Sequence, residues 1–206
     1  MPWKKKTYLP FPFPMSGKTL SLSSLCFIIG LALGGNFFDP PPSPVYQSPG
    51  GTQIQACFTP QQQCLPLILT EIRKAKKEIL IQAYQLTSKP IAEALKEAHE
   101  KDVTIKILAD KSQESSPYSQ IAFLAKIGIE VLIDSKPHIA HSKIILIDGK
   151  CLVGGSYNYS DSAEKPNAEN ILILKNTLII QEYRKNWISR YKLSRPMKSK
   201  LHALNL

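Results

Sequence analysis

The chain has 206 residues, of which 43% are hydrophobic and 20% are charged, and this balance argues against a wholly disordered protein. Its length is sufficient for one domain with a substantial core and some additional sequence. The formal net charge of +10 favours polyanionic partners, either nucleic acid or an anionic membrane surface, although a basic soluble protein without such a partner would carry a similar charge.

The N-terminal residues combine a basic flank with an apolar run, a pattern that predicts export. The lysine-containing residues 1–18 precede a largely apolar run at residues 20–38. We favour a signal peptide cut after Gly34 over an uncleaved membrane anchor, and Met15 is a second candidate start. Either alternative places the rest of the chain outside the cytoplasm, because the positive flank stays inside. The expected location is periplasmic, secreted or anchored to the outer side of the cytoplasmic membrane.

A proline-rich stretch at residues 39–53 predicts an extended linker between the export segment and the folded domain. The domain is expected to cover residues 54–193. The last residues, 194–206, form a basic tail.

The first part of the domain alternates strand and helix patterns, and its later part contains successive strands without helices between them. Apolar runs predict strands at residues 54–58, 78–84, 103–109, 129–133, 142–147, 151–154 and 171–174. Amphipathic or capped patterns predict helices at residues 66–77, 88–101, 116–126 and 177–192. Ser88 and Ser116 are the expected N-caps of the two middle helices. The last three strands have no helix between them, and residues 148–150 form a tight hairpin turn.

This succession of elements predicts the fold class. Three strand–helix–strand units in a row indicate an α/β fold with a mixed, largely parallel sheet that is flanked by helices on both faces.

The four cysteines fall into two groups. Cys57 and Cys64 are seven residues apart and would close a small disulfide loop if the domain is exported; the alternative is two free thiols. Cys26 lies in the apolar run, and Cys151 is expected to be a small core residue. No second Cys or His pair complements these residues, so no metal site is predicted.

Chemistry is concentrated in residues 141–170. Because side chains alternate along a strand, His141 and Lys143 point to the same face and place an imidazole beside an ammonium group. That pair suits chemistry on a phosphate, where one group attacks or protonates and the other holds negative charge. The pattern continues as His-x-Lys, four residues, Asp, six residues, Gly-Ser, one residue, Asn. Its later members are Asp148, Gly155, Ser156 and Asn158.

These intervals resemble the signature of the phospholipase D superfamily, and every one of them matches. The order of the elements, the FTPQQQC segment at 58–64, AYQLTS at 83–88 and AEN at 168–170 resemble its small, exported, single-motif members. Those members include bacterial dimeric endonucleases and mitochondrial-surface proteins. The resemblance covers roughly two-thirds of the chain and implies a phospholipase D-like α/β/α sandwich.

The resemblance also implies metal-independent phosphodiester hydrolysis through a phosphohistidine, with no cofactor. His141 would be the nucleophile, while Lys143 and Asn158 would hold the non-bridging phosphate oxygens with help from Ser156. Glu169 matches the acidic residue that orients the histidine by hydrogen bonding.

Two motif residues are interpreted as structural. Asp148 lies at the far end of the strand from Lys143 and is expected to brace the turn, and Gly155 belongs to the same framework. His138 is expected at the surface or the rim of a pocket, and His99 and His202 carry no functional signal.

One motif supplies one histidine, whereas the family mechanism uses two. We therefore expect a twofold homodimer in which the two His141 residues meet. The expected activity is that of a nonspecific endonuclease on DNA or RNA. The alternative is a phospholipase D acting on membrane headgroups, for which association through residues 20–38 would be an advantage. A catalytically inactive nucleic-acid-binding module is the third, less favoured reading.

Overall fold

A computed structural model of the chain describes residues 45–48 and 51–198. The predicted export segment, most of the predicted linker and His202 lie outside the described residues. Among the helices that are described, none is long and apolar enough to cross a membrane.

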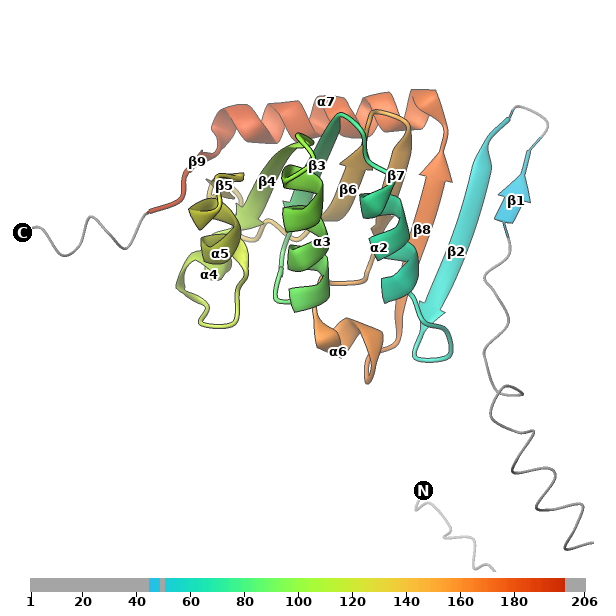
Figure 1. Cartoon of the computed structure of the whole chain (residues 1–206), viewed down its shortest axis with the longest axis horizontal. Coiled ribbons are helices and arrows are strands. Elements are labelled where there is room, and N and C mark those ends of the chain that lie inside the picture. The colour runs from blue at the N-terminus through green and yellow to red at the C-terminus, as the bar shows by residue number, and fades with distance from the viewer. Residues whose placement is uncertain (1–44, 49–50, 199–206) are drawn as a thin grey trace, which may run out of the picture. The chain divides into compact units, whose positions relative to one another are not determined.

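One mixed sheet of nine strands forms the centre of the domain, in the order β1-β2-β8-β7-β6-β3-β4-β5-β9 (Figure 1). The strands are β1 (Val45–Gln47), β2 (Gln53–Thr59), β3 (Glu78–Ala83), β4 (Thr104–Asp110), β5 (Glu130–Asp134), β6 (Lys143–Ile147), β7 (Cys151–Gly155), β8 (Glu169–Lys175) and β9 (Arg195–Pro196). The long apolar runs of the central strands are buried on both faces, as expected for strands covered by helices.

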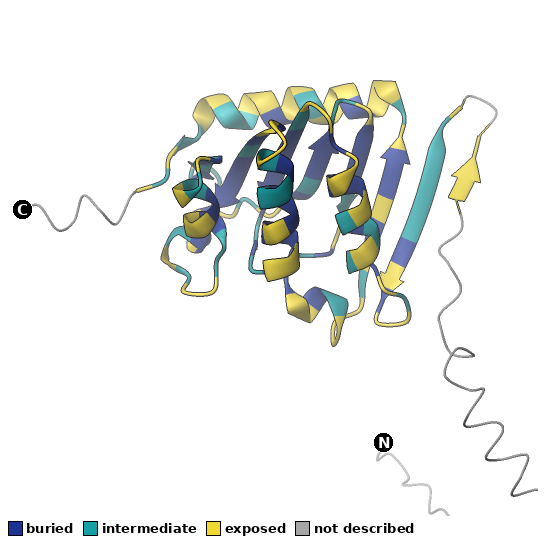
Figure 2. Ribbon diagram, viewed as in Figure 1, coloured by how far each residue is buried: buried dark blue, intermediate teal, exposed yellow. Residues whose placement is uncertain are grey.

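Helices cover both faces of the sheet. They are α2 (Leu65–Arg73), α3 (Lys89–His99), α4 (Ser112–Ser115), α5 (Ile121–Lys126), α6 (Asp161–Glu164) and α7 (Thr177–Leu193). Ile68, Leu95 and Leu124 bury α2, α3 and α5 in one core cluster, and Ile180 and Trp187 bury α7 in a second. The sides of α2 and α3 that face the sheet are buried and their outer sides are exposed (Figure 2). The predicted mixed sheet between two helical layers is confirmed.

Parallel pairing is less extensive than the sequence predicted. Only β3–β4 and β4–β5 are parallel, while the other six neighbouring pairs of the described sheet are antiparallel. The crossover from β2 through α2 to β3 does not make these two strands neighbours. Instead β6, β7 and β8 lie between them, and β2 pairs with β8. The prediction of a largely parallel sheet was wrong because a strand–helix–strand pattern does not fix which strands are adjacent.

The helix expected at residues 116–126 was also placed wrongly at its start. Ser116 ends the short helix α4, and α5 begins only at Ile121. Residues 116–120 do not continue the helix. Instead the N–H of Gln120 donates a hydrogen bond to the carbonyl of Leu86 at 2.8 Å. By contrast, Ser88 caps α3 as predicted and accepts a hydrogen bond from the N–H of Ile91.

Strand pairing extends past both ends of the expected domain. The short strand β1 lies within the predicted linker and pairs with β2. At the other end, β9 pairs with β5, and Arg195 binds Glu114 at 2.7 Å. The Arg195 guanidinium lowers the pKa of the Glu114 carboxyl to about 2. The first residues of the basic tail are therefore tied to the sheet.

Cys57 and Cys64 form the predicted disulfide, which joins the end of β2 to the start of α2. Both cysteines are fully buried in the main core cluster. Cys151 is the free cysteine of the described chain and is buried, as expected for a core residue.

Replacing both Cys57 and Cys64 with alanine should lower the free energy of unfolding by about 2–3 kcal/mol, because the unfolded chain regains the entropy that the closed loop removes. Urea denaturation of the wild-type and variant proteins measures this difference. Dithiothreitol should lower the wild-type midpoint and leave the double variant unchanged. An unchanged wild-type midpoint under reduction would contradict the stabilising role.

Candidate active site

The ends of three antiparallel strands bring the motif residues to one edge of the sheet. β6 begins at Lys143, β7 ends at Gly155 and β8 begins at Glu169. Because neighbouring strands run in opposite directions, the start of one strand lies beside the end of the next. We call this rim, where the strand ends meet, the motif edge; it is formed by the ends of interior strands and not by an outer strand of the sheet. It gathers residues that are 26 positions apart in the chain, from Lys143 to Glu169.

His141 lies on the motif edge, two residues before β6, and its side chain is exposed. Its ring lies against the ring of Tyr84, with the centroids 4.5 Å apart and the planes tilted by 53°. Within the described part of the chain, no hydrogen bond to the His141 ring is found. The imidazole nitrogens are therefore accessible to a substrate.

Lys143 has the opposite environment, since only 4% of it is exposed. Its Nζ donates a hydrogen bond to the backbone carbonyl of His141 at 2.7 Å and lies 4.9 Å from the centroid of the Tyr84 ring. Burial lowers the pKa of Lys143 from its ordinary value, and the negative charge of Glu169 opposes that shift. The structure thus places the ammonium group against the backbone of the exposed histidine.

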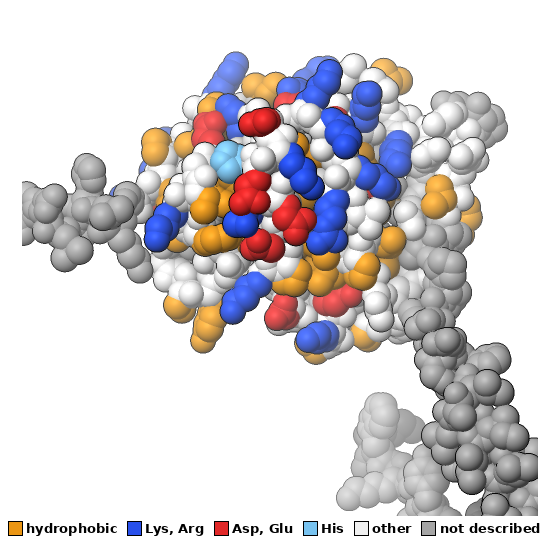
Figure 3. Space-filling view, viewed as in Figure 1, with side chains coloured by type: hydrophobic (Ala, Val, Ile, Leu, Met, Phe, Trp, Pro, Cys, Tyr) orange, Lys and Arg blue, Asp and Glu red, His pale blue; other side chains and the backbone are white. Residues whose placement is uncertain are grey.

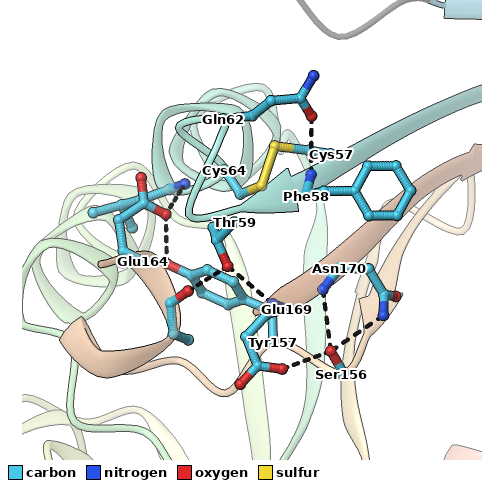
Figure 4. The surroundings of a disulfide bond; sticks show 12 residues. Cys57, Phe58, Thr59, Gln62, Cys64, Ser156, Tyr157, Glu164, Glu169 and Asn170 are labelled. Carbon is cyan, nitrogen blue, oxygen red and sulfur yellow. Dashed lines mark hydrogen bonds between the residues drawn. A yellow bond between two sulfur atoms is a disulfide. The ribbon is translucent and has the colours of Figure 1, made fainter. Parts of the chain in front are cut away.

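Glu169 and Ser156 form a hydrogen-bonded network on the same edge (Figure 4). The Ser156 hydroxyl donates to Glu169 Oε2 at 2.6 Å, and Asn167 Nδ2 donates to Oε1 at 3.0 Å. Ser156 Oγ in turn accepts from the backbone and side-chain N–H groups of Asn170, at 3.1 and 3.2 Å. No hydrogen bond joins Glu169 to His141 among the described residues. In this structure the carboxylate instead fixes Ser156 and acts on Lys143 through its charge.

Thr59 connects this network to the end of β2. Its hydroxyl oxygen accepts from the backbone N–H of Glu169 at 3.1 Å and lies 2.8 Å from the carbonyl oxygen of Ala163 (Figure 4). Thr59 is two residues beyond Cys57, so the disulfide-braced end of β2 holds the first residue of β8.

Gly155 and Asn158 shape the rest of the motif edge. A Cβ atom at Gly155 would lie 2.2 Å from the carbonyl oxygen of Asn170, so a larger residue would force β7 and β8 apart. Asn158 Oδ1 is buried and has no hydrogen-bond partner in the described residues. Because the oxygen and nitrogen of a carboxamide can exchange places, the unpartnered atom can equally be an N–H donor.

The loop that carries His141 is held by Asp110 at the end of β4. The buried Asp110 carboxylate accepts from the backbone N–H of Ala140 at 2.7 Å and from that of Ser112 at 2.9 Å. A hollow of about 200 Å³ opens beside His141. The Asp134–Arg190 ion pair forms part of its lining.

The other described histidines lie apart from this network. His138 is exposed, and His99 Nε2 hydrogen-bonds to the carbonyl oxygen of Ile127 at 3.1 Å. The described residues contain no group of three or more His, Cys, Asp or Glu side chains that could hold a metal ion.

Comparison with protein families places this geometry in a known group. The family model described as cardiolipin synthase, PLD-like domain, matches residues 68–190, which is more than half of the chain. The chain belongs to the phospholipase D superfamily. The match spans the whole motif from His141 to Asn158, Glu169 beyond it, and most of the sheet.

Individual relatives agree with this assignment. The chain is 37% identical to a phospholipase D of Rickettsia prowazekii (strain Madrid E) over 139 residues, which cover 68% of each protein. It is 30% identical to the mitochondrial cardiolipin hydrolase of Xenopus laevis over 146 residues, covering 66% of this chain and 70% of the relative.

Solved structures extend the similarity to three dimensions. Nuc from Salmonella typhimurium, a phospholipase D family member, aligns with a TM-score of 0.68 and 29% identity over 72% of this chain and 99% of Nuc. NucT from Helicobacter pylori has the same fold, with a TM-score of 0.66 and 22% identity over 70% of this chain and 99% of NucT. This member of the superfamily is accordingly a phosphodiester hydrolase.

Asp148 belongs to the phospholipase D motif but lies away from the motif edge, directly after β6. Its carboxylate accepts hydrogen bonds from the backbone N–H groups of Lys76, Lys77 and Glu78 at 2.8–3.0 Å. Burial alone would raise the pKa of Asp148, but these hydrogen bonds and the Lys150 charge outweigh burial and lower it. Asp148 and Gly149 both have positive φ, as in the tight hairpin turn expected at 148–150.

Three residues on or near the motif edge had no assigned role in the sequence prediction. Tyr84 and Asp110 each follow or end a central strand, and Thr59 ends β2. Polar or aromatic residues at the ends of strands are a sequence signal for such site residues, because the ends of neighbouring strands can lie together. Their partners on other elements, however, depend on the strand order, which the sequence pattern did not provide.

Replacing Asp148 with asparagine should destabilise the fold by about 1–3 kcal/mol, because the amide presents an N–H to a backbone N–H and loses the charge. Asparagine keeps a residue type that tolerates positive φ. Because the folded-state pKa of Asp148 lies below the ordinary value of 3.8, its stabilisation is present above that value and is lost as pH falls through the folded-state pKa. Urea denaturation should show a difference at pH 7 that shrinks below pH 4. A loss of kcat without a loss of stability would instead indicate a catalytic role.

Proposed function

We propose that this phospholipase D superfamily member is a metal-independent endonuclease that attacks the phosphodiester with His141. The observation that carries the proposal is an exposed His141 imidazole and a buried Lys143 ammonium that contact the same Tyr84 ring. A nucleophile must be accessible, whereas the group that holds a phosphate oxygen acts more strongly when it is shielded from water.

In the first step, a ring nitrogen of His141 forms a bond to phosphorus while the bond to the leaving oxygen breaks. Lys143 and Asn158 donate hydrogen bonds to the non-bridging oxygens, on which negative charge builds up. Ser156 donates its single hydroxyl proton to Glu169 in this structure, so it can support the second oxygen only after that O–H turns from Glu169 to the phosphate.

The leaving oxygen needs a proton, and we propose that His141 of the partner subunit supplies it. The same histidine then takes a proton from water, whose oxygen attacks phosphorus and releases His141 from the phosphohistidine. A second histidine suited to this role is not found on the motif edge of the described chain, where His138 and His99 have other positions. A twofold homodimer would place two motif edges face to face.

Nucleic acid as the substrate is supported by the net charge of the chain. The net charge of +10 favours a polyanion. The face that carries α2, α3 and α5 has Lys and Arg side chains spread among acidic ones rather than gathered in one stripe (Figure 3). Several of these cations are paired with acids, as in Arg73–Glu97 and Lys96–Glu93, so the support for a nucleic-acid substrate is the net charge of the chain and not a basic stripe on this face.

The alternative substrate is a phospholipid headgroup. It is supported by the 37% identity to a protein named phospholipase D and by the 30% identity to one named mitochondrial cardiolipin hydrolase. The apolar run at residues 20–38 would keep the domain at a membrane surface if it is retained as an anchor.

We further propose that the domain works outside the cytoplasm. The apolar run after a basic flank is the primary support, and the Cys57–Cys64 disulfide fits an oxidising compartment.

The substrate proposal can be tested by offering the purified protein plasmid DNA, RNA, phosphatidylcholine vesicles and cardiolipin vesicles side by side. We expect cleavage of nucleic acid that persists in EDTA and weakens as salt is raised. Cleavage of vesicle lipid alone would select the phospholipase alternative, and loss of activity in EDTA would contradict the metal-independent mechanism.

His141→Ala should reduce cleavage at least roughly 1,000-fold, because the nucleophile is removed. His138→Ala is the matched control, since His138 is exposed and only three positions away. It should retain activity within about twofold of wild type. Equal losses in the two variants would point to a defect of the loop rather than to the nucleophile.

The homodimer proposal predicts how activity depends on mixing. If each site needs two His141 residues, only dimers of two wild-type chains are active. When wild-type and His141→Ala chains are co-expressed, the remaining activity should therefore be proportional to the square of the wild-type fraction. A linear dependence would show that each chain works alone. Purified mixed dimers carrying two different affinity tags should be nearly inactive, and size measurement at micromolar concentration should give twice the mass of one chain.

A further inference from the structure

Tyr84 lies against both motif residues to which the proposed mechanism gives the nucleophile and the phosphate-binding cation. It directly follows β3, and its backbone N–H donates to the carbonyl of Ser142 at 3.0 Å. The centroid of its ring lies 4.5 Å from the centroid of the His141 ring and 4.9 Å from Lys143 Nζ. One half-buried side chain therefore contacts both groups.

The contact with His141 restricts the direction of attack. An imidazole forms a bond to phosphorus along the lone pair of one ring nitrogen, so the ring must face the phosphate correctly. No hydrogen bond to this ring is found in the described chain, and the tilted contact with Tyr84 is a ring interaction that favours one orientation.

The contact with Lys143 concerns the position of its buried ammonium group. Its buried ammonium has three N–H groups, and the described residues provide one hydrogen-bond acceptor for them, the His141 carbonyl. The face of an aromatic ring attracts a cation, and this attraction is stronger away from water. The ring therefore helps to keep Nζ against the His141 backbone while N–H groups remain free for a phosphate oxygen.

The Tyr84 hydroxyl forms no hydrogen bond to any described residue, whereas the ring makes both contacts. We propose that Tyr84 is a positioning residue of this phosphodiesterase, and that its ring rather than its hydroxyl holds the His141 imidazole and the Lys143 ammonium in place. This inference rests on the proposed role of His141 as the nucleophile.

Tyr84→Leu and Tyr84→Phe separate the ring from the hydroxyl. With bis(p-nitrophenyl) phosphate as the probe, Tyr84→Leu should lower kcat roughly 10- to 100-fold, because misdirected groups lose alignment with the reacting phosphate. KM should change less than about threefold. Tyr84→Phe should rescue most of the lost kcat. Tyr46→Leu, at an exposed tyrosine of the edge strand β1, is the matched control and should behave as wild type.

A second readout does not depend on activity. A ring 4.5 Å away should shift the proton resonances of the His141 imidazole in an NMR spectrum, and the shift should be lost in Tyr84→Leu and kept in Tyr84→Phe. A general structural defect would instead alter resonances throughout the domain and lower the unfolding midpoint.

The outcomes distinguish this inference from the function on which it rests. If His141→Ala remains active, the proposed nucleophile is wrong. If His141→Ala is inactive and Tyr84→Leu keeps the wild-type kcat, only the positioning role is overturned. Equal losses of kcat in Tyr84→Phe and Tyr84→Leu would overturn the claim for the ring and assign the role to the hydroxyl.

Discussion

The antiparallel pairing of β6, β7 and β8 is the constraint on which the rest of the site depends. It places the start of β6, the end of β7 and the start of β8 on one edge, and so joins Lys143, Ser156 and Glu169. The tight hairpin after β6 and the close approach of Gly155 to Asn170 keep these strands in register. A slip by one residue would turn every side chain to the opposite face and remove Lys143 from the edge. The spacing of the motif is therefore a consequence of strand geometry as much as of chemistry.

Burying an ammonium group beside an exposed imidazole creates an energetic conflict that the surrounding residues reduce. Desolvation disfavours the charged form of Lys143, while the charge of Glu169, the His141 carbonyl and the Tyr84 ring favour it. Glu169 is itself held by Ser156 and Asn167, so its charge has a fixed position. A bound phosphodiester would add a negative charge at the same place. In the proposed mechanism the unsatisfied N–H groups of Lys143 would become substrate contacts, so that the site would bind an anion without first reorganising.

Much of this architecture could be predicted from the sequence. The apolar runs located the central strands, and the motif intervals selected His141, Lys143 and Ser156, which the structure brings to one edge. Glu169, on the same edge, was selected by the family resemblance of residues 168–170 and not by the motif intervals. Local patterns failed where tertiary contacts decide the outcome. Residues 116–120 form a loop because Gln120 bonds to Leu86, and β2 pairs with β8 rather than with a strand near it in sequence. Tyr84 and Asp110 illustrate the same limit, since each acts through the loop before β6 and its role depends on which strands are neighbours.

The pairing of β2 with β8 also has a consequence for the timing of folding. Thr59 and Glu169 are 110 positions apart, yet their hydrogen bond fixes the start of β8 on the motif edge. Contacts between such distant residues form late, because a long loop must close first. The site therefore cannot assemble until almost the whole domain has left the ribosome, and an emerging or unfolded chain lacks the geometry that cleavage requires. For a hydrolase of an abundant bond, this topology keeps activity dormant until synthesis is nearly finished.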